Sequence, residues 1–108
     1  MDLSDEKRVE AALKFLAGSD ELIAQLKVGV ARTEYLAKLQ DAMAFRAATG
    51  NIEERKAEAK MMPAVQKTWE EHFVAIGEYE KVRAKRERAV LTCDLWRTAQ
   101  ASRRMGNV

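Results

Sequence analysis

The chain has 108 residues, 19 basic and 17 acidic side chains and a net charge of +2, which limits it to one small domain with a small core. Its single cysteine, Cys93, excludes an intrachain disulfide and a cysteine-based zinc site. The N-terminus is polar and acidic and no apolar run reaches 18 residues. We therefore expect no signal peptide, no membrane span and no membrane partner, and a cytoplasmic location.

Low Gly and Pro contents, together with abundant Ala, Leu, Glu, Lys and Arg, predict an all-α chain. Ser4 is suited to cap a first helix over about 4–17, which Gly18 ends. A second helix should cover about 20–49. Its apolar stripe consists of Leu22, Leu26, Val30, Leu36, Leu39, Met43 and Ala47.

A corner should follow the second helix. Gly50 occupies the position of a left-handed C-cap, and Asn51 and Glu54 have the spacing of a capping box that starts a short helix over about 52–60. Pro63 ends or kinks that helix, or serves as the first residue of the next. The last helix, over about 64–105, contains no further proline.

These four segments predict one domain, residues 1–108, built as a long antiparallel helical hairpin resembling a coiled coil. A short N-terminal helix and a short connector helix complete it. Because a chain of this size buries little apolar surface alone, we expect a homo-oligomer, most simply a dimer.

The apolar seam of the last helix leaves two interpretations open. Spacing of 3 and 4 residues from Val65 leads through Arg83 and Arg86, which then need acidic partners or an open surface. Alternatively, the stripe shifts and leaves both arginines in solvent; it then runs through Val82, Ala89 and Trp96. We expect the following residues to form the core or a self-association surface: Trp69, Phe73, Ile76, Tyr79, Val90 and Trp96.

Charge is unevenly distributed along the last helix. Residues 81–104 carry eight basic and two acidic side chains, a net charge of +6, whereas residues 53–80 have a net charge of −3. Such a basic segment neutralises phosphates or binds an acidic protein. It also complements the helix dipole in a purely structural role. The candidate contacts to DNA or to an acidic partner are Lys81, Lys85, Arg88, Arg97, Arg103 and Arg104.

The remaining sequence contains no recognisable catalytic residues or motifs. His72 has no companion for a triad or metal site, and Cys93 falls on the apolar stripe, where a buried thiol is inert. Phosphate-binding, dinucleotide-binding and zinc-protease motifs are all missing from the sequence. We therefore expect no enzyme, no catalytic or metal-binding residue and no cofactor. Met61 and Met62 beside Pro63 fill gaps at the corner or form an adaptable partner surface.

Three blocks of the chain resemble small helical proteins encoded by bacteriophages and prophages, found near single-strand annealing and recombination genes. These blocks are residues 50–57 (GNIEERKA), 78–86 (EYEKVRAKR) and 94–104 (DLWRTAQASRR). The resemblance implies a phage accessory protein in DNA replication or recombination, acting in the host cytoplasm, and it carries over no catalytic residue.

Two functional hypotheses follow. The first is a non-enzymatic accessory that contacts DNA, or a DNA-handling protein, without sequence preference through its basic C-terminal helix. The alternative is a phage inhibitor or adaptor that binds a host or phage protein through a helix face. In that case, substitutions at Met61, Met62 or Trp96 should abolish binding.

Overall fold

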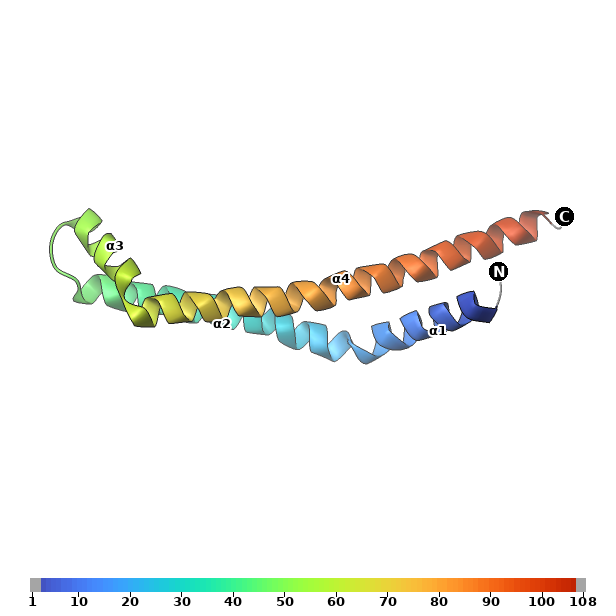
Figure 1. Cartoon of the computed structure of the whole chain (residues 1–108), viewed down its shortest axis with the longest axis horizontal. Coiled ribbons are helices and arrows are strands. Elements are labelled where there is room, and N and C mark those ends of the chain that lie inside the picture. Colours follow the sequence, from blue (N-terminus) through green and yellow to red (C-terminus); the bar gives the residue numbers. More distant parts are fainter. Residues whose placement is uncertain (1–2, 107–108) are drawn as a thin grey trace. The chain divides into compact units, whose positions relative to one another are not determined.

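The computed structural model describes residues 3–106, and these residues form helices with no strand among them. The helices are α1 (Leu3–Gly18), α2 (Asp20–Ala47), α3 (Ile52–Met61) and α4 (Pro63–Gly106) (Figure 1). The predicted all-α class is confirmed, and each helix begins and ends within two residues of its expected bounds. Within the described residues, no helix is both long and apolar enough to cross a membrane.

Local chemistry accounts for the corner between α2 and α4. Gly50 has φ 110°, a left-handed conformation that disfavours any side chain, and a Cβ there would also collide with Glu54. The side chain of Asn51 caps α3 by accepting a 2.9 Å hydrogen bond from the Glu54 backbone N–H. Pro63 is the first residue of α4, so the second of the two roles expected for it is confirmed.

Contacts within the chain divide it into two compact units. One consists of Met1–Ala24 and Glu80–Val108, and we call it the terminal unit. The other consists of Gln25–Tyr79, and we call it the hairpin unit.

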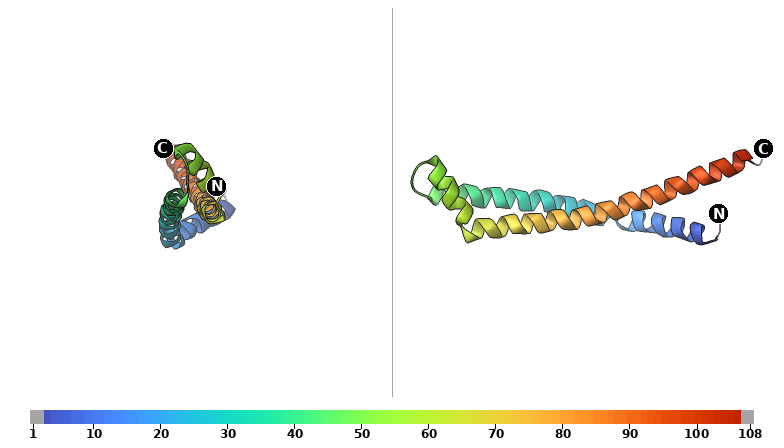
Figure 2. Two further views of the ribbon diagram at one scale, coloured as in Figure 1. Left: turned by 90° about the vertical axis from the view of Figure 1, so that its left-hand side faces the viewer. Right: turned by 45° about the horizontal axis from the view of Figure 1, so that its top comes forward.

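In the hairpin unit, α2 and the first part of α4 run antiparallel, and α3 connects their ends (Figures 1 and 2). Thr33 bonds to His72 and Asp41 bonds to Trp69, so residue numbers rise along one helix as they fall along the other. The buried apolar positions are small ones, Ala37, Ala48, Ala59 and Val65. Such side chains allow close approach of the helices.

In the terminal unit, α1 lies antiparallel to the last part of α4. Ala12, Ala89 and Cys93 form its buried cluster, and Val9, Phe15 and Leu16 pack against them. The Cys93 thiol is buried, as its place on the apolar stripe predicted. No large side chain among the described residues is fully buried, so both units have thin cores.

Candidate functional site

The structure resolves the two interpretations of the α4 seam. Ala89 is buried and Val82 and Trp96 are half-buried, as the shifted stripe predicts. Cys93 and Arg86 belong to the other seam, yet Cys93 is buried in the same cluster as Ala12 and Arg86 is half-buried. The side of α4 that packs against α1 therefore takes residues from both seams. The arginines differ from each other, because the Arg83 side chain is 53% exposed and that of Arg86 only 23%. The expectation that the shift leaves both in solvent is therefore correct for Arg83 and wrong for Arg86.

Arg86 closes the C-terminal end of α1. Its Nη1 donates to the Leu16 carbonyl oxygen at 2.9 Å and to the Ser19 hydroxyl at 2.6 Å. Its Nη2 donates to Asp20 Oδ1 at 2.7 Å. A carbonyl at a helix end lacks an intrahelical partner, and here a guanidinium supplies one. The charge of Arg86 is thus engaged within the terminal unit.

Three of the six candidate contact residues line a surface hollow with a volume of about 380 Å³. They are Lys81, Lys85 and Arg88, and apolar Val82 and Ala84 complete the lining. All three basic side chains are exposed, and none forms an ion pair within residues 3–106. The Lys85 ammonium lies 5.9 Å from the centre of the Phe15 ring, a cation–π contact that places this surface beside α1.

Two further basic residues extend this surface. Arg8 precedes Phe15 by seven residues and therefore shares its face of α1. Arg103 follows Arg88 through steps of 4, 7 and 4 residues, which return to the same side of α4. We call the following set the basic face: Arg8, Lys81, Lys85, Arg88 and Arg103. Sequence reasoning missed Arg8 because it did not pair α1 with this part of α4.

The other two candidates lie on a different side of α4. Arg97 and Arg104 are seven residues apart, and Arg83 precedes Arg97 by two heptads, so the three share one face. This face also carries acid: Arg83 pairs with Glu80 at 3.3 Å and with Glu87 at 3.2 Å. Arg97 lies 3.7 Å from Asp94. The six candidates therefore do not form one continuous surface.

The residues expected in the core or in self-association differ in burial. Half-buried positions are Trp69, Ile76, Tyr79 and Trp96. Phe73 and Val90 are 58% and 46% exposed, so they lie outside the core of the single chain. His72 is buried, with Nδ1 3.0 Å from Thr33 Oγ1 and its ring T-shaped to that of Trp69, an arrangement that holds the hairpin together.

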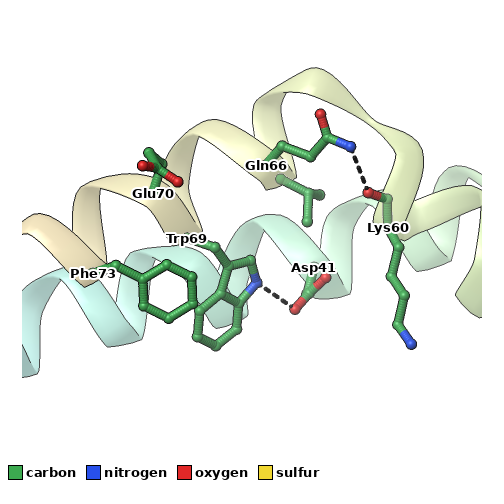
Figure 3. A pocket seen from close by; sticks show the side chains of 7 residues that line it. Asp41, Lys60, Gln66, Trp69, Glu70 and Phe73 are labelled. Atoms are coloured by element: carbon green, nitrogen blue, oxygen red, sulfur yellow. Dashed lines mark hydrogen bonds between the residues drawn. The ribbon is translucent and has the colours of Figure 1, made fainter.

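An aromatic groove of about 520 Å³ lies in the hairpin unit (Figure 3). The Trp69 indole N–H donates to Asp41 Oδ2 at 2.9 Å, and the Phe73 ring lies beside it, 6.2 Å between centres. The Lys60 main chain borders the groove and accepts a hydrogen bond from Gln66 at 3.2 Å. A second hollow of about 400 Å³ adjoins it, sharing Asp41 and Lys60; its lining also includes Lys38, Lys56 and Phe45. No local sequence pattern predicts this groove, because α3 supplies part of its wall through Lys60.

No group of three or more potential metal ligands occurs within the part of the chain that the structure describes. Comparison of the chain with models of protein families, with curated proteins and with solved structures finds no match. Functional reasoning therefore starts from the two surfaces described above, the basic face and the aromatic groove.

Proposed function

We propose that the protein is a non-enzymatic accessory that binds nucleic acid through the basic face, independently of base sequence. The observation that carries this proposal is the segregation of charge in the terminal unit. Five cationic side chains from α1 and α4 share one face, while Glu80, Glu87 and Asp94 lie on the face of Arg83 and Arg97. An unneutralised cationic array is what a phosphate backbone recognises.

The spacing of the array suits a backbone. Lys81, Lys85 and Arg88 advance along the helix axis by about 6 Å and then about 4.5 Å. Phosphates of one duplex strand advance by about 3.4 Å along the axis, so flexible basic side chains reach successive or alternate phosphates. The sequence contains no recognisable base-reading motif, and contacts to phosphates carry no sequence information, so binding should be indifferent to sequence. The resemblance to phage proteins near recombination genes agrees with such a role.

A salt series with fluorescent single-stranded and duplex DNA of unrelated sequences tests this function. The triple variant Lys81→Ala, Lys85→Ala, Arg88→Ala should reduce the slope of log affinity against log salt by roughly 2.7 on duplex. A matched control, Arg97→Ala with Arg104→Ala, removes charge from the other face and should leave the slope unchanged. Equal losses of slope per removed charge in the two variants, or no binding at low salt, would reject the basic face as the contact.

The aromatic groove favours a second candidate function, an adaptor that binds an acidic segment of a host or phage protein. Trp69 and Phe73 offer an apolar wall, while Lys38, Lys56 and Lys60 surround the adjoining hollow. Met61, 73% exposed, and Met62 lie at the nearby corner. For this function, Phe73→Ala or Met61→Ala should abolish partner binding, added salt should weaken wild-type binding by screening the three lysines, and the basic-face variant should bind normally.

A further inference from the structure

Helix α2 carries a second apolar stripe that its hairpin partner does not cover. Leu36, Leu39 and Met43 follow one another at 3 and 4 residues and are 43%, 42% and 56% exposed. Arg32 and Arg46 continue the same spacing at the two ends. The sequence analysis joined these leucines and Met43 in one stripe with Leu26 and Val30, but those two are half-buried, so the structure separates two faces.

Two hydrogen bonds identify the side of the hairpin on which this stripe lies. Ala37 is fully buried and marks the line along which α2 faces α4. Thr33 lies four residues before it and Asp41 four residues after it. Because four residues are slightly more than one helical turn, these two side chains lie on opposite sides of that line. Thr33 bonds to His72 on one side and Asp41 to Trp69 on the other. Leu36, three residues after Thr33, lies on the side of Thr33, opposite the aromatic groove.

The same side of α4 presents small and acidic residues. Thr68 precedes His72 by four residues and Ala75 follows it by three, so both neighbour it on that helix. The complete stripe, with spacings of 4, 3, 4 and 3, consists of Ala64, Thr68, Glu71, Ala75 and Glu78. This side of the hairpin unit therefore combines a row of large apolar side chains with a row of small and acidic ones.

We propose that this side docks against the same side of a second copy of the chain, with α2 of each copy on α4 of the other. The two-fold axis is parallel to the helices. Each copy then inserts Leu36, Leu39 and Met43 against the small residues of its partner. One self-complementary surface thus supplies both halves of a four-helix contact.

The charges on this side of the hairpin unit favour this arrangement. The bonds from Thr33 to His72 and from Asp41 to Trp69 together place Ala37 about level with residues 70–71, and an axis parallel to the helices preserves this level. Arg32 then comes within about one helical turn of Glu71 and Glu78 of the partner subunit. All three side chains are exposed, and none is ion-paired within residues 3–106. The docked copy therefore supplies acidic partners for an arginine that has none among residues 3–106 of its own chain.

The main alternative places α2 antiparallel on α2 of the second copy. Leu39 would lie at the two-fold axis in that dimer, since Arg32 and Arg46 are each seven residues from it. Arg32 would then face Arg46 of the partner subunit. Like charges in register across an interface oppose association, so this arrangement is disfavoured.

The area is sufficient for a specific but weak dimer. Residues 63–79 of α4 extend about 25 Å, and two adjacent helices are about 20 Å wide. The face thus buries roughly 500 Å² per copy and roughly 1,000 Å² in total, at the lower limit for a specific interface. Association in the micromolar range is expected.

Light scattering and sedimentation of the full chain from about 1 to 100 μM test the surface. Leu36→Glu with Met43→Glu should weaken dimerisation at least tenfold at unchanged helicity, because both side chains are already exposed in the single chain. Leu95→Glu is the matched control, since Leu95 is 61% exposed and belongs to the terminal unit rather than to the hairpin unit. A wild-type chain that stays monomeric throughout, or a Phe73→Glu variant that alone abolishes association, would overturn the proposal.

Charge reversal and cross-linking test the arrangement. Arg32→Glu should weaken the dimer, and adding Glu71→Lys with Glu78→Lys should restore it. In a Cys93→Ala background, Leu36→Cys combined with Glu71→Cys should form covalent dimers under mild oxidation, whereas Leu39→Cys alone should not. Rapid cross-linking of the Leu39→Cys variant without cross-linking of the pair would establish the α2-on-α2 alternative and refute ours.

Discussion

Removal of the Arg86 side chain should destabilise the terminal unit far more than removal of its acidic partner. Arg86 is 23% exposed and donates to the Leu16 carbonyl, to buried Ser19 and to Asp20. Arg86→Ala leaves the carbonyl and the hydroxyl without this donor, and hydrogen bonds from a charged group are worth about 1.5–3 kcal/mol each when removed. Because one side of the site remains open to water, we expect a loss of about 2–3 kcal/mol.

Asp20→Asn provides the comparison. The Asp20 side chain is 71% exposed, and an ion pair with one exposed partner contributes about 0–1 kcal/mol. Amide hydrogen exchange of α1 measures both variants directly, since a loss of 2–3 kcal/mol accelerates exchange roughly 30- to 150-fold. Equal acceleration in Arg86→Ala and Asp20→Asn would show that the ion pair, rather than the two hydrogen bonds to Leu16 and Ser19, is responsible. That result would refute our account of Arg86.

Two further predictions concern the corner and the basic face. Gly50→Ala should lower the free energy of unfolding, measured by urea titration, by about 1–3 kcal/mol, because φ 110° is strained for alanine and its Cβ meets Glu54. Gly29 lies in a helix interior with open space around it, so Gly29→Ala should raise that free energy by about 1 kcal/mol in the same titrations. Arg103→Ala should reduce the salt slope of duplex binding by about 1, whereas Arg104→Ala, on the other face, should not change it. A reduced slope for Arg104→Ala with an unchanged slope for Arg103→Ala would show that DNA contacts the face of Arg97 and Arg104 instead of the basic face.

Helix positions were predictable from the sequence because their signals are local. Gly50, Asn51 and Pro63 act through their own backbone or a neighbouring turn, and each marks a boundary found in the structure. The end of α2 at Ala47, two residues before the expected Thr49, lies within the usual fraying of a helix terminus.

Faces were less predictable, because they depend on which helices pack together. Spacing along α4 offered two seams one residue apart, and α1 packs on both, since Ala12 clusters with Ala89 of one seam and Cys93 of the other. The same pairing engaged Arg86 with the end of α1 and brought Phe15, whose face of α1 Arg8 shares, beside Lys85. The aromatic groove needed a third element, α3, whose position relative to Trp69 no periodicity encodes.

The alanine-lined contacts reverse the usual order of mutational sensitivity. In most cores the damaging change removes volume from a large side chain, but here the buried apolar positions include Ala12, Ala37, Ala48, Ala59 and Ala89. Any larger residue at these positions must force helices apart, at a cost of about 1–3 kcal/mol. Many of the large apolar side chains are exposed, and shortening them should have little effect on the stability of the single chain. We therefore expect evolution to tolerate fewer substitutions at the small buried residues than at the large exposed ones, whose identity should depend mainly on what binds to them.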